Sequence, residues 1–157
     1  MPVGPQEFRA ALGHFASGVC VVTAKGGDGH LAGITVTAFC SVSLDPPLVL
    51  ISIDKRARLH DALAGGGRFA VNILSADQEV ISRQFASSRH DQFAGVGYTT
   101  GPDGTPWLED ALAVIECRHA GHYPGGDHTI ILGQVETTRI REAKPLMYFR
   151  GGYGQLA

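Results

Sequence analysis

The stretch ITVTAFCSVSL, residues 34–44, decides the fold because its residues alternate between two kinds. One set is apolar and consists of Ile34, Val36, Ala38, Cys40, Val42 and Leu44. The other set places hydroxyl side chains around one aromatic ring and consists of Thr35, Thr37, Phe39, Ser41 and Ser43. A period of two indicates a β-strand with two unlike faces. We expect the apolar face to join a core, and the uncharged hydroxyl face needs a separate explanation.

The segments around this stretch are mainly further strands. Short apolar runs predict strands at residues 19–24, 48–53, 69–74, 111–119, 128–138 and 146–153, with one more near Tyr98. Helical spacing and capping patterns predict short helices at residues 5–18, about 56–64 and about 75–85. Because the strands follow one another more often than they alternate with helices, they predict a mainly β protein, an antiparallel barrel with a few short flanking helices. No linker or repeat divides the chain, so we expect one domain over residues 1–157.

The composition excludes several classes of protein. The chain has 157 residues, 13 Lys and Arg against 15 Asp and Glu, and no long basic run, so a nucleic-acid partner is not expected. No apolar run approaches the roughly 20 residues of a membrane-spanning helix, and the first ten residues lack the pattern of a secretion signal. Three cysteines without a CxxC pair predict reduced thiols in a cytoplasmic protein.

Two stretches could bind a ligand. The hydroxyl face offers neutral hydrogen-bonding groups beside an aromatic ring, which suits a flat ligand rich in heteroatoms, although an exposed strand face is an equal alternative. The stretch DKRAR, residues 54–58, gathers three cations where a helix is predicted to begin after Asp54, which favours a phosphate site; the simpler alternative is a solvated helix surface.

The histidines near residue 120 do not predict a metal site. Cys117, His119, His122 and His128 have no recognisable zinc spacing, and Pro-Gly-Gly places a turn among them. His128 differs from the others because it follows Gly-Gly-Asp and opens a strand, where its side chain can face a pocket. No glycine-rich nucleotide fingerprint occurs in the chain, so a nucleotide would have to bind to the barrel in another way.

Several of these stretches, in this order, resemble the short-chain flavin reductases, the reductase components of two-component flavin monooxygenases such as 4-hydroxyphenylacetate 3-monooxygenase. The resemblance rests on FASGVCVVTA, GITVTAFCSVSLDPPLVLISI, FAVNIL, FASS, GGDHTIILGQV and PLMYFRGGY, which together cover nearly the whole chain. It implies an FMN-binding split barrel in which the flavin lies along the hydroxyl strand.

The resemblance also implies which residues bind the two nucleotides. Flavin contacts are implied, by position, for Thr35, Thr37, Ala38, Ser41, Val42, Ser43, Ser52, Ile53, Lys55, Phe85, Ala86 and Ser87. NAD(P)H contacts are implied for His128, Tyr148 and Arg150. Family members often carry Ser or Thr after the lysine, where this chain has Ala57 and Leu59, so Arg56 or Arg58 is expected to replace those phosphate ligands.

The implied function is an NAD(P)H-dependent flavin reductase. It would transfer hydride from NADH or NADPH to FAD or FMN, with no catalytic side chain, and supply reduced flavin to a separate oxygenase. A homodimer is implied as well. The alternative is a flavin- or haem-binding split barrel without catalysis, such as an electron carrier, because a fold alone does not fix function.

Overall fold

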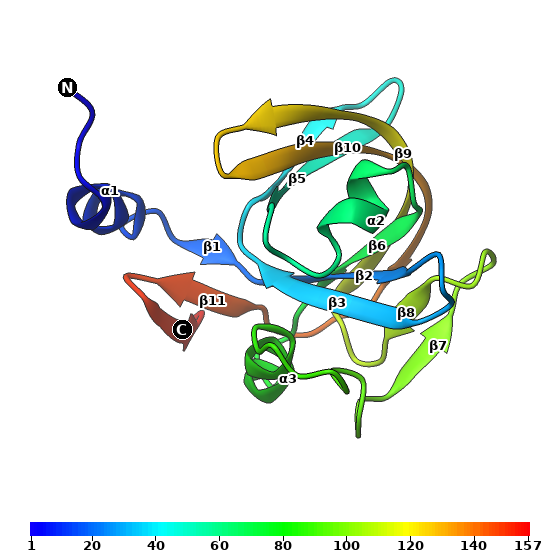
Figure 1. Cartoon of the computed structure of the whole chain (residues 1–157). Coiled ribbons are helices and arrows are strands. Elements are labelled where there is room, and N and C mark those ends of the chain that lie inside the picture. Colours follow the sequence, from blue (N-terminus) through cyan, green and yellow to red (C-terminus); the bar gives the residue numbers. More distant parts are fainter.

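The computed structural model describes residues 1–157 and is mainly β, with three short helices (Figure 1). Seven strands form one antiparallel sheet in the order β3-β2-β6-β9-β10-β5-β4. Their bounds are β2 (Cys20–Lys25), β3 (Leu31–Val36), β4 (Phe39–Ser43), β5 (Leu48–Asp54), β6 (Phe69–Ile73), β9 (Ala113–Gly125) and β10 (His128–Ile140). The predicted antiparallel fold with a few short flanking helices is therefore confirmed.

Smaller elements surround this sheet. A three-stranded sheet has the order β1-β11-β12, and a hairpin pairs β7 with β8. Their bounds are β1 (Ser17–Gly18), β11 (Leu146–Phe149), β12 (Gly152–Gln155), β7 (Tyr98–Thr100) and β8 (Pro106–Leu108). The helices are α1 (Pro5–Leu12), α2 (His60–Ala64) and α3 (Glu79–Phe85). No helix combines the length and the apolar character that crossing a membrane requires.

The large sheet curls because its two edge strands are consecutive in the chain. Only Thr37 and Ala38 separate β3 from β4. The Ser52 amide, on β5, donates a hydrogen bond to the Ala38 carbonyl at 3.1 Å, which ties the link to the opposite edge of the sheet. The result is a split barrel, and α2 lies across one of its mouths (Figure 1).

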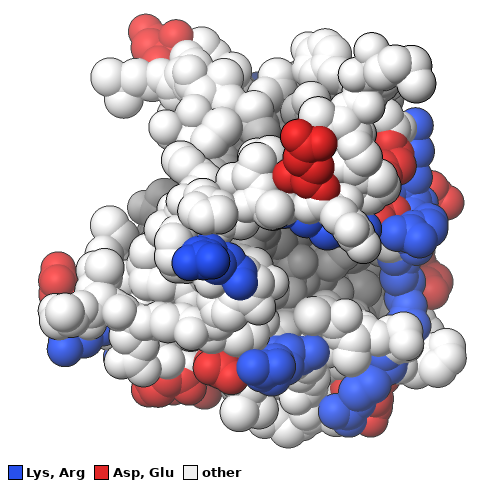
Figure 2. Space-filling view, turned by 90° about the vertical axis from the view of Figure 1, so that its left-hand side faces the viewer, with Lys and Arg blue, Asp and Glu red and all other residues white.

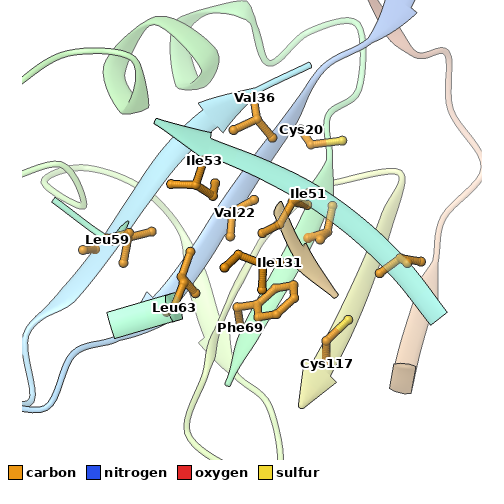
Figure 3. Packing of buried hydrophobic residues seen from close by; sticks show 14 residues of the cluster. Cys20, Val22, Val36, Ile51, Ile53, Leu59, Leu63, Phe69, Cys117 and Ile131 are labelled. Carbon is orange, nitrogen blue, oxygen red and sulfur yellow. The ribbon is translucent and has the colours of Figure 1, made fainter. Parts of the chain in front are cut away.

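The core fills the inside of this curled sheet (Figure 3). Ile51, Ile53, Phe69 and Ile131 have no exposed surface and come from strands on different sides of the barrel. Leu63 of α2 is also fully buried in the same cluster, so the helix is held by the apolar side chain that it inserts. Burial of side chains of this size contributes about 1.5–3 kcal/mol each.

The predicted strand at residues 34–44 is two strands in the structure, β3 and β4. The link at residues 37–38 divides the predicted strand, and the side chains change faces there. Val36 is buried, but beyond the link it is Phe39 that packs on the core, while Val42 and Leu44 are 47% and 92% exposed. The expectation that the whole apolar set joins the core is therefore wrong for the second half of the stretch, because a shift of one residue exchanges the faces of a strand.

The helices also differ in extent from their predictions. The helix expected from residue 56 begins at His60, because the Asp54 carboxylate accepts the Arg56 amide at 2.8 Å and holds residues 54–57 in a turn. The three cations of DKRAR therefore lie on a turn and not at a helix N-terminus. The helix expected after Ser75 begins at Glu79, and only half of the capping box forms, with the Ser75 amide donating to Gln78 Oε1 at 2.9 Å.

Two terminal elements complete the comparison with the prediction. Pro5 opens α1 as expected, but the helix ends at Leu12 instead of continuing to Gly18, and none of its residues is buried. The strand predicted at residues 146–153 is a hairpin of β11 and β12, because Arg150 and Gly151 form a turn with φ values of 52° and 78°.

A substitution at Gly133, a glycine that contacts the core, provides a test of this packing. A Cβ atom at Gly133 of β10 would lie 2.6 Å from Cζ of Phe69 and 2.8 Å from Cβ of Cys117. We expect Gly133→Ala to lower the free energy of unfolding by about 1–3 kcal/mol, the usual cost of overpacking, as measured by urea denaturation. Gly154→Ala is the matched control, since nothing lies within 4 Å of a Cβ there. Equal stability of the two variants would contradict this account of the core.

Candidate functional site

Three hollows follow one another along β3 and β4, and we call them together the β3–β4 track. The arginine pocket, of about 310 Å³, is lined by Gly33, Ile34, Arg56, Ala57, Arg58, Phe85, Ala86, Ser87, Ser88 and Gln92. The tyrosine pocket, of about 240 Å³, is lined by Val19, Thr35, Val36, Thr37, Ala86, Tyr148 and Tyr153. The apolar groove, of about 630 Å³, is lined by Phe8, Arg9, Leu12, Gly13, Phe15, Ser17, Thr37, Ala38, Phe39, Cys40, Leu50, Tyr148 and Gly151.

The three hollows share walls in order along the chain. Ala86 lines both the arginine pocket and the tyrosine pocket, and Thr37 and Tyr148 line both the tyrosine pocket and the apolar groove. The backbone from Gly33 to Cys40 spans roughly 20 Å at about 3.3 Å per strand residue. The track therefore suits a long ligand whose parts differ in polarity.

The arginine pocket has a positive end. Arg56 is neutralised locally, because its Nη2 lies 2.9 Å from Asp54 Oδ2, and this pairing holds the pKa of the Asp54 carboxyl well below its usual range. Arg58 has no acidic partner: its Nη1 and Nη2 donate to the carbonyls of Arg89 and Ser88 at 3.1 and 3.2 Å. An uncompensated guanidinium next to serine hydroxyls favours an anionic group, such as a phosphate.

The tyrosine pocket is held together by a chain of hydrogen bonds. Thr35 Oγ1 donates to the Ser82 carbonyl at 2.6 Å, and the hydroxyls of Ser82 and Tyr153 lie 2.7 Å apart. The Tyr153 ring meets Tyr148 edge to face at 5.4 Å, and Arg83 lies over it at 4.9 Å. These contacts join β3, α3 and the C-terminal hairpin, so the two rings form a fixed wall.

The apolar groove lies between α1 and the start of β4. Its walls include Phe8, Leu12, Phe15 and Phe39, and it contains no acidic side chain. The side of the molecule that carries α1, β1 and β11 is hollowed near its centre, and Lys and Arg side chains lie around the hollow together with a few acidic ones (Figure 2). A groove of this kind suits a flat aromatic ring system, which apolar walls shield from water.

The predicted flavin contacts fall into three groups. Thr35, Thr37, Ala38, Phe85, Ala86 and Ser87 all line the track. A second group lies on β4 outside the three hollows and comprises Ser41, Val42 and Ser43. On the β5 side, Ser52 is half-buried and Lys55 is exposed, while Ile53 is fully buried, so any ligand contact of Ile53 would use its backbone.

The predicted nicotinamide contacts lie on two different sheets. Tyr148 lines the tyrosine pocket and the apolar groove. Arg150 occupies the exposed β11–β12 turn. His128 lies beside the β9–β10 turn, opposite Asp54 on β5, and its Nδ1 is 2.7 Å from Asp127 Oδ1. His128 lines none of the three hollows, so one chain does not bring it together with Tyr148.

Sequence reasoning missed several residues that line the track. The sequence predicts Phe8, Leu12 and Phe15 only as one stripe of a helix, and it assigns Gln92 to no site. Tyr153, with Tyr148 and Arg150, is a possible ligand clamp or a closure of the barrel by sequence, and the structure places it in the wall of the tyrosine pocket. The helical spacing of Phe8, Leu12 and Phe15 indicated an apolar face, but it showed neither that the helix ends at Leu12, before Phe15, nor that this face borders a groove instead of a core. Gln92 gave no signal, because its contacts with Gly33 and α3 join distant parts of the chain.

Comparisons with known proteins agree with this geometry. Residues 12–157 match a protein family described as flavin reductase like domain. The chain is 39% identical over 156 residues to a flavin reductase from Pseudomonas putida, covering 99% of this chain and 92% of that protein. It is 42% identical over 152 residues to the reductase component of 4-hydroxyphenylacetate 3-monooxygenase from Thermus thermophilus, covering 96% of each.

A solved structure shows the same fold. The NADH:FAD oxidoreductase from Streptomyces globisporus, in complex with NAD and FAD fragments, is similar with a TM-score of 0.92 and 38% identity, covering 100% of this chain and 97% of that one.

A cysteine in the groove provides a direct test of occupancy. Cys40 is exposed and lines the apolar groove, whereas burial raises the pKa of Cys20 and Cys117 to about 12. We expect Cys40 to react with a thiol reagent in the folded protein, the other two thiols to react only after unfolding, and FAD or FMN to slow the Cys40 reaction at least fivefold.

The Cys40→Ser variant is the control for this experiment, since it should show no reaction while folded. An unchanged Cys40 rate at saturating flavin would mean that the ligand does not occupy the apolar groove.

Proposed function

The chain belongs to the flavin reductase like domain family, and we propose that it oxidises NADH, transfers the hydride to FAD or FMN, and releases reduced flavin to a separate oxygenase. The observation that carries the proposal is the β3–β4 track, which has a cation at one end and an apolar groove at the other. A flavin nucleotide has the matching polarity, with phosphate at one end and a flat ring at the other.

The residues of the track fit this ligand. Bound flavin supplies the redox chemistry, accepting a hydride from the nicotinamide ring at N5. Arg58 and the serines at positions 87 and 88 would hold the phosphate, and Thr37 and Ala38 would line the chain that leads from it. The groove walls, including Phe39, would shield the ring from water. No side chain is required to form a bond with substrate, so the contribution of the protein is binding and orientation.

We assign the remaining predicted contacts in the same way. Ser41, Val42 and Ser43 would meet the flavin ring, and Ser52, Ile53 and Lys55 would approach the phosphate side. His128, Tyr148 and Arg150 would bind the nicotinamide nucleotide. Within one chain, His128 and Tyr148 lie on different sheets. We therefore expect two subunits to contribute residues to one complete nucleotide site.

A homodimer also accounts for the apolar surface of the single chain. α1 stands away from the barrel (Figure 1), with Phe8 and Leu12 exposed by 56% and 55%, and Phe15 in the turn after it is exposed by 78%. On β4, Val42 and Leu44 are exposed as well. A monomer rarely leaves so many large apolar side chains in water, and covering them is the usual role of a subunit interface.

We further propose that residues 1–157 act as one domain in the cytoplasm. The three cysteines form no disulfide, and two of them are buried thiols. This is the state expected in a reducing compartment, where nicotinamide nucleotides are also available.

NADH oxidation, followed at 340 nm with and without added flavin, tests the function. We expect turnover that requires free FAD or FMN and saturates with it, because the track is open to solvent and the flavin is a substrate. The same assay with NADPH decides between the two donors. Bound flavin without turnover from either donor would contradict a reductase and favour an electron carrier or other binding protein.

The dimer is tested by disrupting α1. We expect light scattering to give twice the 16.6 kDa mass of one chain, and Phe8→Lys with Leu12→Lys to give a monomer that binds flavin at least tenfold more weakly. Val80→Lys is the matched control, since Val80 is 73% exposed on α3. A wild-type protein of single-chain mass, or a double variant that remains dimeric, would show that this face is not the interface.

A further inference from the structure

The helix that lies across the barrel mouth, α2, is bonded to the strand that carries His128 (Figure 1). His60 opens α2, and its Nε2 lies 2.7 Å from Oγ1 of Thr129 on β10. The His60 side chain is 15% exposed, and Thr129 is buried. A buried hydroxyl requires a hydrogen-bond partner, and His60 provides the one that Thr129 has.

The His60 ring is oriented from its other side as well. Its Nδ1 lies 3.0 Å from Oδ1 of Asp61, and because a carboxylate can only accept a hydrogen bond, Nδ1 carries the proton. Nε2 of the neutral ring then accepts the hydroxyl proton of Thr129. Because Thr129 is buried, this chain of three groups orients side chains and does not present a nucleophile to a substrate.

Thr129 is placed to set the direction of its neighbour in the strand. The side chains of residues 122–127 are exposed, and among the residues within two positions of His128, Thr129 alone is buried. Successive side chains of a strand point to opposite faces. Since Thr129 points inward to α2, His128 points away from the core, and a rotation of the strand at Thr129 would turn His128 with it.

The other contacts of the β9–β10 turn fix its place but not the direction of His128. The Lys55 amide donates to the Asp127 carbonyl at 3.0 Å, which ties the turn to residues 54–57. Nδ1 of His128 lies 2.7 Å from Oδ1 of Asp127, and this contact lowers the pKa of the Asp127 carboxyl. The Asp127 side chain is itself exposed, so it offers His128 no anchor inside the protein.

We propose that His60 is a positioning residue for the hydride donor: through the hydroxyl of Thr129 it holds His128 in the direction in which its ring contacts NADH. This inference rests on the proposed reductase function and on the nucleotide contact proposed for His128. It gives a role in the reaction to α2, which lines none of the three hollows of the β3–β4 track.

The test removes the hydrogen bond from either end. Thr129→Val keeps the shape of the side chain without its hydroxyl, and His60→Leu removes the partner. For each variant we expect the KM for NADH, measured at 340 nm with saturating flavin, to rise at least fivefold, because a displaced His128 contacts the nucleotide poorly. The kcat and the KM for flavin should stay within twofold of wild type, the pattern of a lost binding contact.

A double-mutant cycle and two controls separate positioning from a loss of stability. The double variant should raise the KM for NADH no more than twofold beyond the larger single effect, because both changes break one bond. His60→Gln, whose side-chain carbonyl can accept the Thr129 hydroxyl, should keep the wild-type KM. Val71→Ala, a buried position on β6, which does not pair with β10, should lower stability and leave this KM unchanged. Single effects that multiply in the double variant, or the same rise in Val71→Ala, would overturn the proposal.

A spectroscopic measurement tests the inference without turnover. The chain has 7 histidines, and the ring signal of His128 in a proton–carbon correlation spectrum is identified by its loss in His128→Asn. We expect this signal to shift in Thr129→Val and in His60→Leu and to stay in place in Val71→Ala. An unchanged signal in the first two variants would overturn the positioning role even if NADH turnover is found. Absence of NADH turnover in the wild type would instead overturn the reductase function and with it the role toward NADH, while a shifted signal would still show the coupling of His60 to His128.

Discussion

The two-residue link between β3 and β4 is the constraint on which the rest of the structure depends. Thr37 and Ala38 join the first and last strands of a seven-stranded sheet, so the sheet must curl until its edges meet. The hydrogen bond from Ser52 to Ala38 fixes that meeting point. As a consequence, the backbone of residues 33–40 crosses from one edge to the other, and the three hollows of the β3–β4 track lie along this crossing.

The sequence was sufficient to locate most of the strands, but not to predict which face of each strand packs on the core. Apolar runs located β2 and β6 to within one residue, because burial on both faces leaves a continuous signal. The runs at β5 and β10 were also found to within two residues, although one side of these strands is only half-buried. β9 extends beyond its predicted end at residue 119 to Gly125, because its last residues are exposed and leave no apolar signal. The alternation at residues 34–44 was real, yet it could not show that the faces exchange at the link, since both halves keep a period of two. Val36 and Phe39 both reach the core only because the chain bends between them.

Other parts of the site depend on contacts between distant residues, which no local pattern reports. Between the predicted helix at residues 75–85 and the predicted strand at residues 111–119, the sequence indicates only a strand near Tyr98. The structure adds β8 there, which is fixed by buried side chains: Asn72 accepts the Leu108 amide at 2.9 Å, and Thr23 donates to the Pro106 carbonyl at 2.7 Å. In the same way, Arg58 is directed by the carbonyls of Ser88 and Arg89. The sequence indicated cations near a phosphate site but not which of them Asp54 would neutralise.

The distribution of charge along the track bears on release as well as on binding. Arg56 is paired with Asp54, and Arg58 already donates to two carbonyls, so few free donors remain for a phosphate. The hydroxyl of Thr35 is likewise used by the Ser82 carbonyl. A site with one uncompensated cation, apolar walls and few unused donors can select a flavin nucleotide without holding it tightly. Weak retention is what a reductase requires if its reduced flavin must leave for another protein. A dissociation constant far below the working concentration of flavin would mean slow dissociation and would delay that departure.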